Sequence, residues 1–232
     1  MNSSPAASPA RWLQLKTDIL LMTNISTLFI SAILLMTISS CGQTAKTVDN
    51  GAYVVDPNVK DKVDRKVKSF NGITMSSMDF KMYENDSIIG DTYAKGKSID
   101  ECMTMTTLQG DTINIVGFMG MFAGFGYQIA LFKDTCIVQH FAKSDAEIYK
   151  LHKNDSLEFS VSVPCKTYKL TLSKKPTFKK GEILEGIIEL TSDDYYEAAN
   201  GKESRYKMQL TGYFKTDPLE SIEDRYNKTK DK

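Results

Sequence analysis

Apolar and polar residues alternate with a period of two through much of the chain after residue 70. The alternation is clearest over residues 157–163, 168–172 and 206–214. Such a period places one side of a strand against a core and the other side in water, which is typical of antiparallel sheets. The same pattern predicts further strands over residues 78–83, 102–108, 112–118, 127–132, 137–141 and 183–190.

Short polar sequences such as ENDS, LQGD, FKDT and KKGE separate many of these segments and are typical of turns. Many short strands joined by such turns predict an all-β domain, an antiparallel β-sandwich with a small β-barrel as the alternative. One or two short helices are expected as well. Residues 144–154 begin with a capping box of Ser144 and Glu147, and residues 192–201 begin with acidic side chains.

The amino-terminal part of the chain has a different pattern. Residues 19–45 carry no charged side chain, and the densest apolar run within them is 28–36. That run has the length of the hydrophobic region of a signal peptide, and Arg11 and Lys16 lie before it as such a peptide requires. A single membrane-spanning helix is the alternative for this stretch.

The apolar run ends in Ile38-Ser39-Ser40-Cys41. This sequence resembles the lipobox of bacterial lipoproteins, in which a branched apolar residue and two small residues precede a cysteine. The resemblance implies that signal peptidase II cuts before Cys41, and that acyl chains such as palmitate on this residue anchor the protein to a membrane. Gly42 follows Cys41 where an aspartate would favour the inner membrane, so the resemblance favours the outer membrane of the cell envelope.

These patterns divide the chain into four parts. Residues 1–40 are the predicted signal peptide, and residues 41–68 are too polar to bury much surface, which is typical of a tether. Residues 69–218 form the predicted β-domain, and residues 219–232 a polar carboxy-terminal tail. Within the tether, residues 53–55 are apolar enough to add an edge strand.

The chain has 29 basic and 29 acidic residues, so its net charge is zero. This balance argues against nucleic-acid binding, which normally requires a basic excess. Besides Cys41, the chain contains Cys102, Cys136 and Cys165, which can form at most one intramolecular disulfide. Their spacing includes no pair separated by two residues, so no zinc site and no cofactor is predicted.

The sequence GFMGMFAGFGY, residues 117–127, combines four glycines with phenylalanine and methionine. One interpretation is a mobile lip over an apolar ligand, since methionine and phenylalanine offer adaptable apolar surface. The other is a bent pair of strands that fills the core. Under the first interpretation, the ligand-binding residues are Phe118, Met121, Phe122, Phe125 and Tyr127.

Recognisable catalytic motifs are absent from the sequence, including G-x-S-x-G and H-E-x-x-H. His140 and His152 are the only histidines, and Tyr195 and Tyr196 could stack on a sugar ring. The sequence therefore favours a lipid-anchored, non-catalytic binding or envelope-assembly module with an envelope protein as partner. An apolar-ligand-binding domain and an extracytoplasmic hydrolase that uses a histidine are the alternatives.

Overall fold

The computed structural model describes residues 51–70, 73–96, 98–221 and 223. All described residues belong to one compact unit. The predicted signal peptide, its lipobox and Cys41 lie outside the described residues. No helix within the described ranges is both long enough and apolar enough to cross a membrane.

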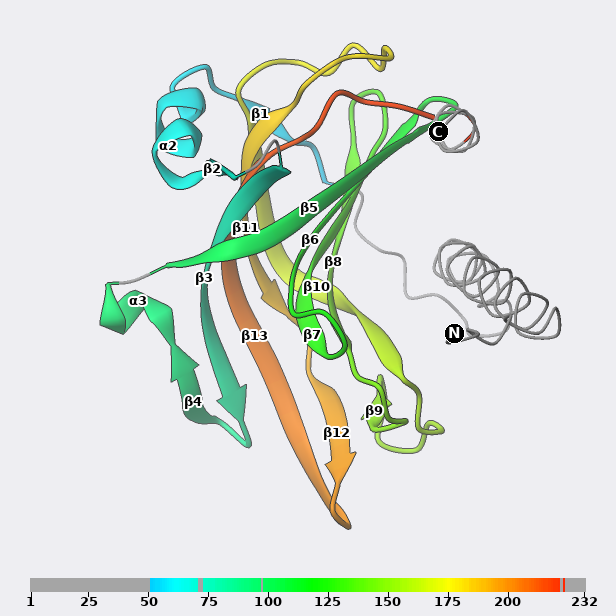
Figure 1. Cartoon of the computed structure of the whole chain (residues 1–232). Coiled ribbons are helices and arrows are strands. Elements are labelled where there is room, and N and C mark those ends of the chain that lie inside the picture. Colours follow the sequence, from blue (N-terminus) through cyan, green and yellow to red (C-terminus); the bar gives the residue numbers. More distant parts are fainter. Residues whose placement is uncertain (1–50, 71–72, 97, 222, 224–232) are drawn as a thin grey trace, which may run out of the picture. The chain divides into compact units, whose positions relative to one another are not determined.

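Eight antiparallel strands form a sheet that closes on itself (Figure 1). Each strand pairs with the next one in the ring, and the last pairs with the first. In ring order the strands are β3 (Ile73–Glu84), β5 (Ile99–Gln109), β6 (Thr112–Met119), β7 (Gly124–Leu131), β8 (Cys136–Lys143), β10 (Ser160–Leu172), β11 (Glu185–Ser192) and β13 (Lys202–Lys215). The prediction of an antiparallel all-β domain is confirmed, and the closed ring corresponds to its barrel form.

Smaller elements extend this ring at its edges and ends. Strand β1 pairs with β10, β2 and β4 pair with β3, and β12 bridges β13 and β9. Two short helices complete the described fold. The bounds of these elements are β1 Val54–Val55, α2 Val59–Lys66, β2 Lys68–Phe70, β4 Ser87–Asp91, α3 Thr92–Lys95, β9 Tyr149–Lys150 and β12 Tyr195–Ala199.

Strand β10 joins two segments that the sequence pattern separates. Its first half pairs with β8 and its second half with β11, and the register shifts between Cys165 and Thr167. A bulge of this kind bends a strand and increases its twist, which lets one strand serve two neighbours around the ring. The alternation of apolar residues is interrupted at the same point, because Pro164 and Lys166 lie there.

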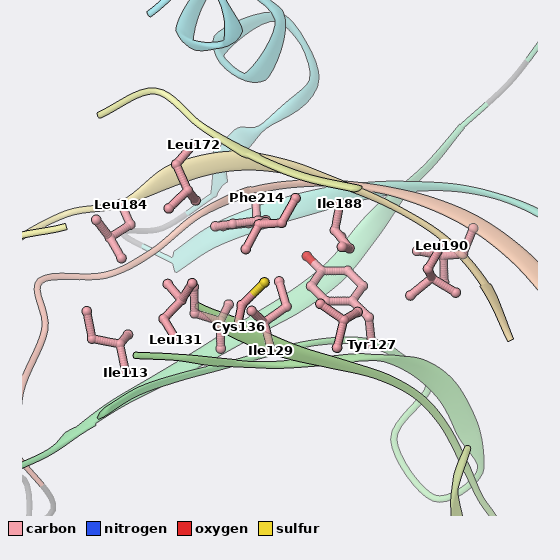
Figure 2. Packing of buried hydrophobic residues seen from close by; sticks show 14 of the residues in the cluster. Ile113, Tyr127, Ile129, Leu131, Cys136, Leu172, Leu184, Ile188, Leu190 and Phe214 are labelled. Atoms are coloured by element: carbon pink, nitrogen blue, oxygen red, sulfur yellow. The ribbon is translucent and has the colours of Figure 1, made fainter. Parts of the chain in front are cut away.

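The core fills the space between opposite walls of the ring (Figure 2). Tyr127 crosses this space from β7. A Cβ atom at Gly117 would lie 2.1 Å from the Tyr127 ring, and one at Gly212 on β13 would lie 2.4 Å from it. Glycine at these two positions therefore makes room for the ring, since any larger residue would displace it.

One end of the ring is closed by the segment that follows β13. The Leu219 backbone N–H donates a hydrogen bond to the Glu182 carbonyl (2.8 Å), and the Leu219 carbonyl accepts one from Gly181 (2.8 Å). Both Leu219 and Leu184 are fully buried in the main core cluster. The folded region therefore continues past residue 218, where the sequence predicted the start of an exposed tail.

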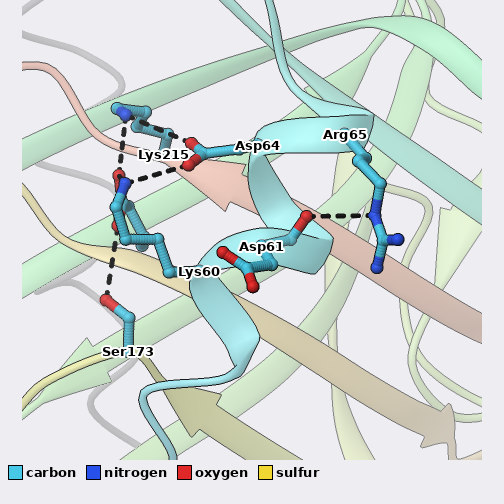
Figure 3. A network of polar contacts seen from close by, with 7 residues as sticks. Lys60, Asp61, Asp64, Arg65, Ser173 and Lys215 are labelled. Atoms are coloured by element: carbon cyan, nitrogen blue, oxygen red, sulfur yellow. Dashed lines mark hydrogen bonds and ion pairs between the residues drawn. The ribbon is translucent and has the colours of Figure 1, made fainter.

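Helix α2 packs on the outer face of β11 and β13 near the same end. Val59 and Val63 lie one helical turn apart and are both buried, so they form its apolar face. A charged network surrounds the helix (Figure 3). The Lys60 Nζ atom lies 2.9 Å from Asp64 and 3.2 Å from Glu185, and Lys215 Nζ lies 2.7 Å from Glu185.

Three local predictions are wrong. Residues 144–154 form no helix, and they contribute only the two-residue strand β9. Most of the second predicted helix is the strand β12, because pairing with β13 and β9 satisfies its backbone groups. The predicted tether includes β1 and α2, so the folded region begins before residue 69, while the edge strand expected at residues 53–55 is confirmed as β1.

Candidate ligand-binding site

A cavity of about 300 Å³ opens at the end of the ring opposite Leu219. The last residues of β3, β6 and β8 and the first residues of β7 and β13 surround it, and β9 and β12 form one side. Strands β9 and β12 lie toward the bottom of Figure 1. The cavity lining consists of Met82, Met119, Gly120, Ala123, Gly124, Phe125, Ala142, Tyr149, Tyr195, Glu197 and Tyr206.

Three tyrosines form the side of the cavity made by β9, β12 and β13. Strand pairing places Tyr195 opposite Tyr206, and their rings stack with centroids 5.8 Å apart and an interplanar angle of 30°. The Tyr149 ring lies 6.3 Å from that of Tyr195 at 56°. Tyr195 is the most deeply buried of the three, with 2% of its surface exposed.

Glu197 is the carboxylate of the cavity. Pairing of β12 with β9 places it opposite Tyr149, and it is half-buried. Burial raises the pKa of Glu197, and the negative charge of Glu84 raises it further. Burial also raises the pKa of Tyr149 and of Tyr206 to about 12, with an added contribution from the charge of Glu197. The phenol groups are therefore neutral hydrogen-bonding groups at physiological pH.

Much of the remaining lining is apolar. Met82, Met119 and Phe125 contribute to it, and Phe125 is held edge-on against Phe80 with ring centroids 5.0 Å apart. Edge-on packing of this kind fixes the orientation of the ring. The cavity therefore combines apolar surface with tyrosine side chains and one carboxylate.

His140 lies directly behind the cavity wall. Its ring centroid is 5.4 Å from that of Tyr195 and 6.4 Å from that of Phe125. The Nδ1 atom lies 2.8 Å from the Gly126 carbonyl, so it carries the proton and donates. Nε2 is therefore an acceptor, and it has no hydrogen-bond partner among the described residues. Burial lowers the pKa of His140 to about 4, so the imidazole is neutral.

The structure separates the five ligand-binding residues predicted within 117–127. Phe125 lines the cavity, and Tyr127 lies in the core. Met121 and Phe122 lie at the tip of the hairpin between β6 and β7, with 73% and 80% of their surfaces exposed. Phe118 lies under the Lys143 ammonium, which is 5.4 Å from its ring centroid. The segment thus contributes both to the core and to the rim of the cavity, and ligand binding by these residues stays a prediction.

A second hollow of about 330 Å³ lies on the outer face of β10, β11 and β13. Polar side chains such as Lys169, Glu189 and Thr211 line it, together with Tyr93. The Tyr93 and Thr211 hydroxyl oxygens are 2.8 Å apart and so satisfy each other. The cavity at the end of the ring is the better candidate because apolar and aromatic side chains make up most of its lining, as in small-molecule sites, whereas mostly polar side chains line the second hollow.

A histidine-based catalytic pair is not formed among the described residues. The His140 ring contacts a carbonyl and two aromatic rings, and the His152 backbone N–H, not its ring, donates to Asp155 (2.8 Å). The described part of the chain also contains no group of three or more histidine, cysteine, aspartate or glutamate side chains suited to holding a metal ion. Cys102, Cys136 and Cys165 form no disulfide with one another, and burial raises the pKa of Cys136 to about 11.

Comparison of the chain with protein-family models, with characterised proteins and with solved structures finds no match. The chemistry of the cavity therefore carries the functional inference.

Sequence patterns indicated only part of this site. Tyr195 was singled out as a ring for ligand stacking, and it is a wall of the cavity. Tyr149, Glu197 and Tyr206 were not recognised as neighbours, because they lie on three strands that meet only through long-range pairing. Tyr206 shares the period of two with Met208 and Leu210, and this pattern indicates that its ring faces the interior.

Proposed function

We propose that the protein is a non-catalytic binding module of the cell envelope that holds a small ligand in the cavity at the open end of the ring. The observation that carries this proposal is the asymmetry of the two ends. Leu184 and Leu219 fill one end, whereas the other contains a cavity with aromatic walls. A lipid on Cys41, implied by the lipobox resemblance, would hold the domain at a membrane surface.

The cavity suits a ligand of modest size. Its volume lies at the lower limit of the range typical of small-molecule sites. Tyrosine and phenylalanine supply large contact areas at a small cost in conformational entropy, because each has only two side-chain torsions. The hydroxyl groups and Glu197 provide a polar side that can fix the orientation of the ligand. The envelope protein partner inferred from the sequence stays a prediction.

A neutral fluorescent probe, N-phenyl-1-naphthylamine, tests the proposal with the full chain in non-ionic detergent. We expect saturable binding at one site per chain, and loss of at least tenfold in affinity in Ala142→Phe, because Ala142 lines the cavity. Ala130→Phe is the matched control. Ala130 lies on β7, next to the strand of Ala142, but on the other side of the sheet. The affinity of Ala130→Phe for the probe should therefore equal that of the unmodified chain.

Partitioning of the probe into detergent contributes equally to all three proteins and cancels in the comparison. Folding of Ala142→Phe is checked by its circular dichroism spectrum, and Met119→Trp provides a second way to fill the cavity from its rim. Equal fluorescence from all proteins would show that the cavity binds no probe and would overturn the proposal.

A further inference from the structure

The ligand class follows from the charges and rings of the cavity. Building on the proposed function, we infer that the cavity binds an organic ammonium ion, with Glu197 as its counter-ion and with Tyr149, Tyr195 and Tyr206 around the charged group. The hydrocarbon part of the ligand lies against Met82, Met119 and Phe125.

Glu197 lacks a cationic partner among the described residues, although basic side chains surround it in the sequence and in the sheet. Each of these cations pairs with another carboxylate. Lys150 Nζ lies 2.7 Å from Glu203, Lys202 Nζ lies 3.7 Å from Glu84, and Arg205 Nη1 lies 3.5 Å from Asp194. The carboxylate inside the cavity is thus left for a charge that comes from outside the chain.

The three tyrosines are suited to that charge. The face of a phenol ring carries negative potential and attracts a cation within about 6 Å of its centroid. The rings of Tyr149 and Tyr206 lie on either side of Tyr195, with centroids 6.3 Å and 5.8 Å from it. Their hydroxyl oxygens can also accept hydrogen bonds from an ammonium group that carries protons.

Other ligand charges fit this cavity less well. A neutral ligand desolvates Glu197 without giving it a partner, so it should bind more weakly than a cation of the same shape. An anion would be repelled by both Glu197 and Glu84, which lies close enough to raise the pKa of Glu197. A cation offsets the desolvation of Glu197 and its repulsion by Glu84 together.

Choline and its neutral isostere, 3,3-dimethyl-1-butanol, separate charge from shape. The two have nearly the same size, but only choline carries a positive charge. We expect isothermal titration calorimetry on the full chain to show choline bound at least tenfold more tightly than the isostere. Ethylamine, titrated in parallel, distinguishes a quaternary ammonium from a primary one, and preference for either supports the inference.

Glu197→Gln keeps the shape of the side chain and removes its charge. We expect it to weaken choline binding at least tenfold. It should not weaken binding of the neutral isostere, because removal of the charge also removes the cost of desolvating it. Tyr206→Leu should weaken choline binding several-fold through loss of one ring. Glu189→Gln is the matched control on the exposed outer face of β11, and it should bind choline like the unmodified chain.

The outcomes distinguish this inference from the function on which it rests. The ammonium ligand is overturned if choline binds no more tightly than its isostere and ethylamine does not bind, or if binding of the preferred ammonium ion survives Glu197→Gln. If N-phenyl-1-naphthylamine binds in the cavity while neither choline nor ethylamine does, the ammonium inference fails and the binding module stands. If no probe binds, both fail.

Discussion

At the scale of single residues, the open end of the domain depends on side chains that are buried next to it and not only on those that line it. His140 donates through Nδ1 to the Gly126 carbonyl and packs against Tyr195 and Phe125. Its position thereby fixes two rings of the cavity. A positive charge at this site would be desolvated and would find no carboxylate, so the fold requires the neutral imidazole.

The lowered pKa of His140 makes stability depend on pH. In the unfolded chain the imidazole has an ordinary pKa near 6.5, and in the folded protein burial lowers it to about 4. The unfolded state therefore binds more protons between these values, and the free energy of unfolding should fall by about 3 kcal/mol as the pH drops from 6.5 to 4. Urea denaturation across this range measures the effect.

Carboxylates also contribute to this pH dependence, and comparison with His140→Gln removes their contribution. In His140→Gln the free energy of unfolding should fall less between pH 6.5 and 4 than in the unmodified protein. His152→Gln is the control, because that side chain is exposed. If the free energy of unfolding depends on pH equally in His140→Gln and in the unmodified protein, then the pKa of His140 does not differ between the folded and unfolded states.

At the scale of elements, sequence patterns located the strands well and the helices poorly. Alternation over residues 206–214 corresponds to β13, because the two sides of that strand face core and solvent. Ser144 does accept a hydrogen bond from a nearby backbone amide, that of Ala146, but in a turn. Its local signal for a helix start was outweighed by long-range pairing, which places Tyr149 and Tyr195 in the cavity wall.

Helix α2 is present in the structure but was not predicted from the sequence. Its eight residues include six charged ones and only two valines, which is too few for a clear apolar pattern. Those valines lie on one face, and the sheet supplies the apolar surface that the helix itself lacks. The cavity could not be predicted for the same reason. Its residues come from seven strands, and no local pattern specifies which strand ends meet.

The stability that α2 provides should come from its valines and not from its surface ion pairs. Val63 is fully buried, so Val63→Ala should lower the free energy of unfolding by about 1–3 kcal/mol. Asp64→Ala removes the exposed carboxylate that pairs with Lys60 and Lys215 and should have a much smaller effect. Chemical denaturation of both variants compares them, and a larger loss in Asp64→Ala would assign the stability to the charged network.

At the scale of the whole molecule, the proposed function joins a lipid attachment residue to a folded domain with one open end. Neither property implies the other. The lipobox resemblance concerns residues 38–41, whereas the cavity is formed by residues from 82 to 206. Each must therefore be tested by itself.

Mass spectrometry of the amino-terminal peptide tests the lipid attachment. For the protein isolated from its native membrane we expect a chain that begins at Cys41 and carries acyl groups. Cys41→Ser should leave the precursor uncut, since the thiol is the acceptor of the lipid. An unmodified Cys41 within an uncut chain would contradict the lipoprotein assignment and favour the membrane-spanning alternative.

The Tyr127 ring, which crosses the interior between Gly117 and Gly212, also limits what the open end can accept. The phenol group fills the interior partway between the two ends of the closed sheet, and the rest of the core lies beyond it. A flexible acyl chain that entered the open end could not extend through this filled core and would have to leave much of its length in water. The proposed site should therefore prefer compact molecules to long-chain lipids.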